Sequence, residues 1–315
     1  MVRVPGDLPG QRRALTVGVA SGPPPTDPDQ VEDAVRAVLE GRVRGAVLEA
    51  DNLDVLRAIP DGVVDLAYAD PPFATGGHRR LSSIRTGEGE QVRTGFGGRP
   101  YHYRVVSDLT WADDLPLGTH LESLALRLTE MRRVLADHGS LYLHVDWRTV
   151  HYVRLLLDGV FGAEHFLNEI VWAYDYGGRA RDRWPRKHDT ILWYAKGDHW
   201  LFDRDAVDRI PYLAPGLVGP QKAARGKLPT DVWWMTIVPP ASAERTGYPT
   251  QKPLRLLERI VAASSRPGDL VLDPYAGSGT TGVAAARHGR RWLLVDRNAE
   301  AIAIARGRIV AEDGT

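Results

Sequence analysis

Apolar positions along the chain follow two spacings, and each spacing predicts a different kind of element. Continuous apolar runs rich in β-branched residues predict buried strands at residues 46–50, 63–69, 140–145, 169–174, 190–195, 269–273 and 292–296. Apolar residues three and four positions apart predict helices near residues 30–40, 53–59, 119–136, 150–157, 254–261, 282–288 and 298–311. Because strands and helices alternate, we expect an α/β fold with a doubly wound, mostly parallel sheet.

Three segments break these patterns. Residues 1–28 mix Gly, Pro and Arg and predict a flexible N-terminal tail. Residues 76–104 interleave glycines with arginines, which predicts a long structureless loop, either functional or a solvated insertion. Residues 197–247 are rich in Pro, Gly and Trp and predict a small irregular subdomain, with residues 231–234 as its candidate core.

The segment Asp70-Pro71-Pro72-Phe73 directly follows the strand predicted at 63–69. Open α/β sheets place their ligands at the carboxyl ends of strands, and two consecutive prolines fix the backbone there. The turn therefore presents a carboxylate, backbone carbonyls and one aromatic face, which together can hold a planar heterocycle with an exocyclic amine. If this segment stood alone, an ordinary strand-ending turn would be the preferred interpretation. A second motif favours a ligand-binding turn instead.

The second motif is a glycine-rich turn, Pro-Tyr-Ala-Gly-Ser-Gly-Thr-Thr-Gly at residues 274–282, between a predicted strand and a helix. Glycines let the backbone approach a ligand, and the helix N-terminus offers free N–H groups to a carboxylate or phosphate. No Lys follows the last glycine, so the turn is not a P-loop. The next strand ends at Asp296, where an acid accepts hydrogen bonds from ribose hydroxyls. The combination favours a nucleotide-type site over an ordinary tight turn with a solvated acid.

Cations gather in the joint between the strands predicted at 169–174 and 190–195. This composition is typical of a segment that grips a phosphodiester backbone, although a solvated hairpin tip would look similar. The candidate DNA-binding residues are Arg179, Arg181, Arg183, Arg186 and Lys187, with Arg79 and Arg80 of the inserted loop.

Composition limits the remaining possibilities. The chain has 40 Lys and Arg against 40 Asp and Glu, so any basic surface must be local. The absence of cysteine excludes disulfides, thiolate metal sites and thiol nucleophiles. The ten histidines show no metal-ligand spacing, and no metal is expected. No apolar run approaches the roughly 20 residues of a membrane span, so we expect a cytoplasmic protein.

The order of the two motifs resembles that of the permuted, β-class DNA amino-methyltransferases, in which the catalytic motif precedes the cofactor motif. The likeness spans about residues 46 to 311 and includes similar stretches at 50–56, 141–146, 177–179, 187–188, 231–233 and 250–253. The resemblance implies a Rossmann-like methyltransferase. It would have a catalytic half at 29–196, a target-recognition region at 197–247 and a cofactor-binding half at 248–315.

The resemblance also implies S-adenosylmethionine as the methyl donor and double-stranded DNA as the substrate. Asp273 would face the methionine ammonium, Asp296 the ribose and Asp51 the adenine of the cofactor. The implied cofactor-binding residues are Asp51, Lys252, Pro253, Asp273, Tyr275, Gly277, Ser278, Gly279, Thr280, Thr281 and Asp296. The implied catalytic residues are Asp70, Pro71, Pro72 and Phe73.

An acid in the first position of the catalytic tetrapeptide favours adenine N6 over cytosine N4 as the target, by the same resemblance. A homodimer and an accompanying restriction endonuclease are further expectations from it. The alternatives are a methyltransferase acting on RNA, a non-catalytic DNA-binding protein, and a nicotinamide oxidoreductase. The last would explain neither the Asp70 turn nor the basic joint.

Overall fold

The computed structural model describes residues 27–73, 77–94, 100–113, 116–177 and 180–313, and mostly the backbone alone within 77–113. Residues 1–26 of the predicted tail lie outside the described part. The helices are α1 Pro28–Leu39, α2 Asn52–Ala58, α3 Leu117–Val134, α4 Val150–Phe161, α5 Pro220–Arg225, α6 Leu254–Ser264, α7 Thr280–Arg287 and α8 Ala299–Asp313. The strands are β1 Gly45–Glu49, β2 Val64–Ala69, β3 Gly77–Thr94, β4 Pro100–Asp113, β5 Leu135–Val145, β6 Phe166–Ala173, β7 His188–Ala195, β8 Val232–Trp234, β9 Leu270–Asp273 and β10 Arg291–Asp296.

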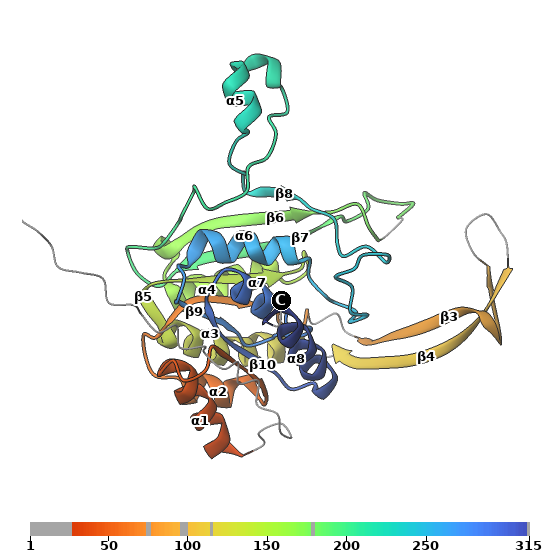
Figure 1. Ribbon diagram of the computed structural model, residues 1–315, viewed down its shortest axis with the longest axis horizontal. Coiled ribbons are helices and arrows are strands. Elements are labelled where there is room, and N and C mark those ends of the chain that lie inside the picture. The colour runs from red at the N-terminus through yellow and green to blue at the C-terminus, as the bar shows by residue number, and fades with distance from the viewer. Residues whose placement is uncertain (1–26, 74–76, 95–99, 114–115, 178–179, 314–315) are drawn as a thin grey trace, which may run out of the picture.

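One twisted sheet runs through the molecule in the order β1-β10-β9-β2-β5-β7-β6-β8 (Figure 1). Every neighbouring pair in this sheet is parallel except the two pairs that β7 makes, with β5 and with β6. The expected doubly wound, mostly parallel sheet is therefore confirmed. Strands from the two ends of the chain are interleaved, because β9 and β10 lie between β1 and β2.

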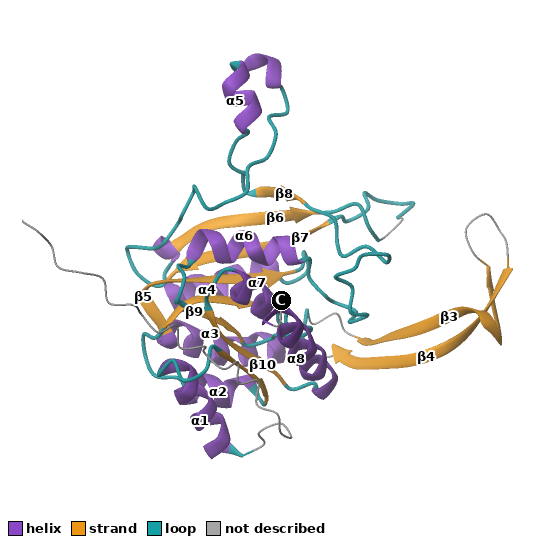
Figure 2. Ribbon diagram, viewed as in Figure 1, coloured by secondary structure: helices purple, strands orange, loops and turns teal. Residues whose placement is uncertain are grey.

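Helices cover both faces of the sheet (Figure 2), as the continuous apolar strands require. On one face, Val55 of α2 and Leu128 of α3 belong to the same buried cluster as Ala67 of β2. On the other face, Leu257 of α6 packs in a second cluster with Leu66. Successive residues of β2 thus enter opposite cores, which fixes the rotation of the strand and the direction in which its carboxyl end points.

The expectation of a structureless loop at 76–104 is wrong. The strands β3 and β4 pair antiparallel in a ribbon that forms its own two-stranded sheet and projects from the domain (Figure 1). The glycines suggested a loop, but two of them, Gly87 and Gly89, lie where the ladder shifts register between Thr86 and Gln91. Glycine inside a strand commonly marks such an irregularity rather than the end of the strand.

Two further boundaries differ from the prediction. The helix predicted near residues 119–136 ends at Val134, and the strand β5 begins at once with Leu135. The segment 197–247 is irregular as expected, but it also supplies β8 to the edge of the main sheet. Trp233 of β8 is buried, whereas Trp234 is exposed, so only part of the proposed core at 231–234 is a core.

The residues before β8 form a projection that carries α5 and stands off the body of the domain (Figure 1). Its base is closed by an antiparallel bridge between Ile210 and Lys227. Among the described helices, none is long and apolar enough to cross a membrane.

Candidate active site

Four neighbouring strands each end at an aspartate. Asp51 follows β1, Asp296 ends β10 and Asp273 ends β9, and Asp70 follows β2. These strands are adjacent in the sheet order β1-β10-β9-β2, and all four are parallel. Their carboxyl ends therefore meet at one edge, so residues more than two hundred positions apart in the chain share one site.

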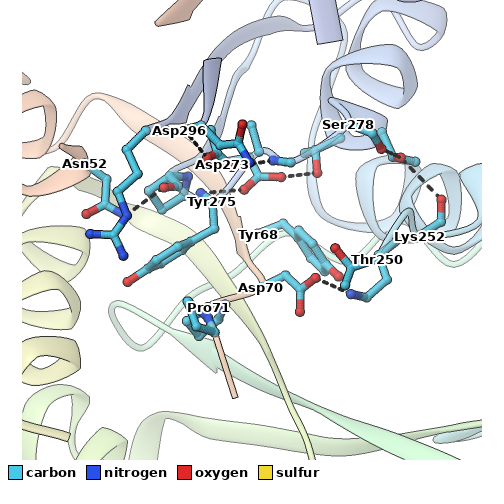
Figure 3. Close-up of a pocket in the computed structure, with 18 of the residues that line it drawn as sticks. Asn52, Tyr68, Asp70, Pro71, Thr250, Lys252, Asp273, Tyr275, Ser278 and Asp296 are labelled. Carbon is cyan, nitrogen blue, oxygen red and sulfur yellow. Dashed lines mark hydrogen bonds and ion pairs between the residues drawn. The ribbon is translucent and has the colours of Figure 1, made fainter. Parts of the chain in front are cut away.

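A cavity of about 720 Å³ opens at this edge (Figure 3). Figure 3 shows Asp70 and Lys252 on one side, Asp273 and Asp296 on the other, and Tyr68 between them. The residues predicted from sequence that line it are Asp51, Asp70, Pro71, Pro72, Phe73, Lys252, Asp273, Tyr275, Gly277, Ser278, Thr280, Thr281 and Asp296. Both predicted motifs thus face a single cavity.

Two residues predicted for the cofactor site do not line the cavity. Pro253 is the N-cap residue of α6, where its fixed φ suits the entry to a helix. Gly279 is the N-cap residue of α7 and has φ +75°, and a Cβ there would lie 2.6 Å from the Cβ of Ala305 in α8. Both residues shape the turns that present their neighbours.

The glycine turn is held against the strand ends by two carboxylates. Asp296 accepts hydrogen bonds from the backbone N–H groups of Gly277 and Asn298, both at 2.9 Å. Asp273 accepts from the hydroxyl of Thr281 and from the N–H of Tyr275 at 3.0 Å. The acids thereby fix the loop as well as face the cavity.

Both carboxyls have raised pKa values. Burial raises the pKa of Asp273 to about 7, with a smaller rise from the charges of Asp70 and Asp296, against its two hydrogen bonds, which lower it. Burial also raises the pKa of Asp296, and hydrogen bonds from the backbone oppose that rise. A buried carboxyl with a raised pKa gains most from a cationic ligand, because the ligand replaces the lost hydration.

Sequence reasoning missed an arginine that holds the far end of the cavity. Arg127 of α3 donates to Asp51 at 2.9 Å and also binds the side-chain oxygen of Asn52. Asn52 in turn donates to the carbonyl of Pro274 at 2.8 Å, which ties α2 to the glycine turn. Arg127 lies in the middle of an amphipathic helix and carries no motif that could have singled it out.

Asp70 is paired with a cation. The ammonium of Lys252 forms an ion pair with Oδ2 of Asp70, and both side chains are largely buried. Lys252 also lies 5.9 Å from the centre of the Phe73 ring. The sequence predicted Lys252 for the cofactor side alone, whereas its amine reaches the catalytic turn and connects the two motifs.

A chain of buried polar groups lies behind the Asp70 turn. The hydroxyl of Tyr68 is 2.9 Å from Nδ1 of His144, and Nε2 of His144 is 3.3 Å from Asp189. Tyr174 donates to the other oxygen of Asp189 at 3.2 Å. Burial would raise the pKa of Asp189, but the hydrogen bond and charge of His144, with the charge of Lys252, lower it below its ordinary value.

The ring of His144 also supports Phe73, whose centre lies 5.9 Å away. His144 is completely buried, which favours a structural role for it. None of its partners could be identified from sequence, because Tyr68 and Phe73 precede it by about 70 residues and Asp189 follows it by 45.

The basic joint between β6 and β7 lies at the same edge of the sheet. Thr190 of β7 is paired with Val145, which ends β5, the neighbour of the strand that carries Asp70. Arg186 stacks on Trp147 beyond the end of β5, with its Cζ 3.5 Å from the ring centre. The exposed cations that the structure describes here are Arg181, Arg183 and Arg186, with Lys187 partly exposed.

Three other predicted DNA-binding residues cannot be placed as side chains. Arg179 lies outside the described residues, and Arg79 and Arg80 are described only by their backbone in β3. Among the described residues, no group of three His, Asp or Glu side chains could hold a metal ion.

Residues 64–307 match the family of N6/N4 methyltransferases described as DNA methylase. The match covers more than half of the chain, so the protein belongs to this family of DNA methylases. The resemblance drawn from the two motifs is confirmed.

Two relatives illustrate the range of the family. DNA adenine methyltransferase YhdJ of Escherichia coli (strain K12) is 30% identical over 276 residues, which cover 83% of this chain and 81% of the relative. Type II methyltransferase M.HpaI of Haemophilus parainfluenzae is 35% identical over 205 residues, which cover 64% of this chain and 63% of the relative.

Solved structures share the fold. The cytosine-N4-specific PvuII DNA methyltransferase superposes with a TM-score of 0.60 at 15% identity, covering 84% of this chain and 86% of that one. A putative DNA modification methylase from Thermus thermophilus, complexed with S-adenosyl-L-methionine, gives a TM-score of 0.52 at 22% identity. That superposition covers 84% of this chain and 93% of the other.

Proposed function

We propose that this DNA methylase transfers the methyl group of S-adenosylmethionine to the exocyclic amine of a base in double-stranded DNA, with adenine N6 as the target. The observation that supports this most strongly is that the Asp70 turn and the glycine turn open into one cavity. A cofactor-binding turn and an amine-binding turn must share a cavity if a group is to pass directly between their ligands.

The cavity fits S-adenosylmethionine by the chemistry of its lining. Asp273 is buried at a strand end and suits the methionine ammonium, and Asp296 suits the ribose hydroxyls. Asp51 and Arg127 also line the cavity and would bind the adenine of the cofactor. Gly277 leaves the turn open, because a Cβ there would lie 3.2 Å from the ring of Tyr248. The bound cofactor supplies an electrophilic methyl group.

The Asp70 turn prepares the amine for attack. The lone pair of an exocyclic amine is delocalised into the ring, so the nitrogen is a poor nucleophile. Hydrogen bonds from the amine to Asp70 and to the carbonyl of Pro71 favour a more tetrahedral nitrogen, with its lone pair directed at the methyl group. The carboxylate of Asp70 then stabilises the positive charge that develops on nitrogen.

Phe73 and Lys252 complete the turn. The ring of Phe73, supported by His144, offers a face on which the target base can stack. Lys252 forms an ion pair with Asp70, which orients the carboxyl group in the turn that receives the amine.

A base inside a duplex cannot reach a cavity at the end of a sheet, so the enzyme must flip it out, at a cost of a few kcal/mol. In this proposal the exposed cations of the basic joint hold the distorted DNA backbone. The β3–β4 ribbon would enter the major groove, which is wide enough for a two-stranded β-ribbon. The segment 197–247 is the proposed reader of sequence. A homodimer and a partner restriction endonuclease remain proposals from family resemblance.

Adenine is favoured because an acid, Asp70, stands first in the tetrapeptide, and because the relative YhdJ is named a DNA adenine methyltransferase. Cytosine N4 is the alternative. The two amines pose the same chemical problem, and the cavity can serve either.

The test is nucleoside mass spectrometry of duplex DNA incubated with the protein and S-adenosylmethionine. We expect N6-methyladenine from the native protein and none from Asp70→Ala, which should still bind the cofactor and DNA. N4-methylcytosine would contradict the choice of base. Equal methylation by Asp70→Ala would contradict the role of the turn.

A further inference from the structure

Trp184 is the most exposed tryptophan that the structure describes. Its side chain is 92% exposed, and no ring contact of it is found among the described residues. An indole left in water forgoes the hydrophobic stabilisation that burial of its ring would give. Tryptophan is enriched at binding interfaces, because its ring combines a large apolar surface with a polar N–H group.

The chain around Trp184 holds it in a defined position. Arg186, two residues on, is stacked on Trp147 of the body of the domain. Lys187 donates to the carbonyl of Asp175 at 3.1 Å, which ties the two ends of the loop together. Pro185 restricts the backbone of the residue before it to extended conformations. The indole is thus presented on an anchored loop at little further entropic cost.

The charges beside Trp184 match a nucleic-acid backbone. Arg183 precedes it, and Arg181 and Arg186 are also exposed. A tryptophan between arginines combines a stacking group with phosphate-binding groups, which is the pairing that a distorted strand requires.

The position of the loop relative to Asp70 is also suitable. The loop joins β6 and β7, which follow β2 and β5 in the sheet order, and Figure 1 shows it leaving the sheet on the same side as the β3–β4 ribbon. Sheet neighbours lie about 5 Å apart, so the loop starts about 10 to 15 Å along the sheet from the strand that carries Asp70.

We propose that Trp184 inserts into the base stack at the position vacated by the flipped target base. Insertion of apolar side chains between bases is a known way to compensate for unstacking. Here the indole would stabilise the open duplex while the target base occupies the cavity beside Asp70. The inference rests on the proposed methylation of a flipped base.

The experiment uses a duplex that carries the recognition site, once methylation mapping has identified it, with 2-aminopurine at the target position. Native protein, Trp184→Ala and Trp184→Phe are compared by fluorescence and by kcat/KM. Each is also assayed on a duplex whose target is mismatched, because a mismatch removes most of the cost of flipping. Trp200→Ala is the matched control. Trp200 is another exposed indole and follows the carboxyl end of β7. Because β7 is antiparallel to β5, this end lies at the edge of the sheet opposite to Asp70. Asp198, two residues before Trp200, pairs with His165 beside the start of β6.

We expect Trp184→Ala to lower kcat/KM on the matched duplex by about 5-fold to about 150-fold, the range for loss of one aromatic stacking contact. The 2-aminopurine signal should fall in parallel. The mismatched duplex should restore most of the rate, Trp184→Phe should retain part of it, and Trp200→Ala should resemble the native protein. Thermal unfolding should be unchanged, because the side chain of Trp184 is almost wholly exposed.

Three results would overturn the proposal. Unchanged kinetics and fluorescence in Trp184→Ala would show that the indole does not enter the stack. An equal loss on matched and mismatched DNA would assign Trp184 to ordinary DNA contact, and a change of oligomeric state in light scattering would assign it to a second copy of the chain.

Failure of the proposed function gives a different pattern. If the native protein binds DNA but methylates none, the enzymatic proposal fails, and the inference for Trp184 that rests on it fails too. If the native protein methylates DNA and Trp184→Ala equals it in kinetics and fluorescence, only the inference for Trp184 fails. If the native protein binds no DNA, both proposals fail.

Discussion

Asp273 shows how one residue can couple cofactor binding to pH. Its pKa of about 7 means that, without ligand, the carboxyl is largely protonated at pH 6 and largely ionised at pH 8. A cationic ligand binds the ionised form. Protonation therefore competes with binding below pH 7 and ceases to compete above it.

We expect the affinity for S-adenosylmethionine to rise between pH 5.5 and 7.5, by up to about tenfold per unit below pH 7. Asp273→Asn cannot change its charge, so it should bind more weakly, by roughly tenfold or more, and with a flatter pH profile. Isothermal titration calorimetry across this range measures both. A native affinity independent of pH would show that Asp273 does not face the ammonium.

Some residues of the site could be predicted from the sequence, and others could not. Asp70, Asp273 and Asp296 could be predicted because each ends an apolar run, and strand ends are where ligands bind. Arg127 could not, because its role depends on Asn52, 75 residues away. The partner of Asp70 was similarly hidden, since only the folded chain brings Lys252 to it.

At the scale of elements, the close approach of α7 to α8 depends on Gly279. Gly279 and Gly289 have nearly equal φ, +75° and +74°, but a Cβ at Gly289 would meet only Pro267 at 3.8 Å. A Cβ at Gly279 would press on Ala305, at 2.6 Å from its Cβ and 2.9 Å from its Cα. Substitutions at Gly279 and Gly289 therefore separate the cost of backbone strain from the cost of steric overlap.

We predict that Gly289→Ala costs about 1 kcal/mol, from strain alone. Gly279→Ala should cost a further 1 to 3 kcal/mol, roughly, because two helices must separate. It should also weaken cofactor binding, since Gly279 leads into the turn that contains Gly277. Urea unfolding and calorimetry give the two values, and equal costs would mean that α8 yields without resistance.

Elements whose apolar pattern is strong were predicted well, and the failures have physical reasons. Among the described strands, β3 and β4 pair only with each other, and residues 77–94 carry glycines and arginines in place of the apolar run that identified the other strands. The strand β8 has only three residues and is defined by its pairing with β6 rather than by its own sequence. Edge pairing of this kind cannot be read from one segment alone.

At the scale of the molecule, affinity for DNA must come from local charge, because the net charge is zero. Each phosphate contact that a protein loses lowers the slope of log K against log salt by about 0.9. Arg181→Ala with Arg183→Ala should therefore lower the slope by about 2 and weaken binding in low salt.

The control for charge is Arg36→Ala with Arg42→Ala, which removes two exposed arginines in and after α1. They precede β1, an edge strand that the sheet order separates from β6 and β7 of the basic joint. The salt slope of this control should equal that of the native protein. Fluorescence anisotropy with one duplex at several salt concentrations measures the salt slopes of the native protein and of both double variants. Equal slopes for both double variants would remove the basic joint from the DNA interface.

The order of strands was beyond sequence reasoning. Alternation of strands and helices predicted the class of fold, but nothing local specifies that β9 and β10 insert between β1 and β2. That insertion is what brings Asp70 beside Asp273.

The same insertion has a consequence for biosynthesis. Until the ribosome has made residues 270–296, β1 lacks β10, its one partner among the described strands, and β2 lacks β9 on one flank. The nascent chain therefore carries a gap in the middle of its sheet, with exposed strand edges that invite aggregation. The segment that contains β9 and β10 fills that gap and brings Asp273 and Asp296 to the cavity, so the active site forms only after this segment has left the ribosome.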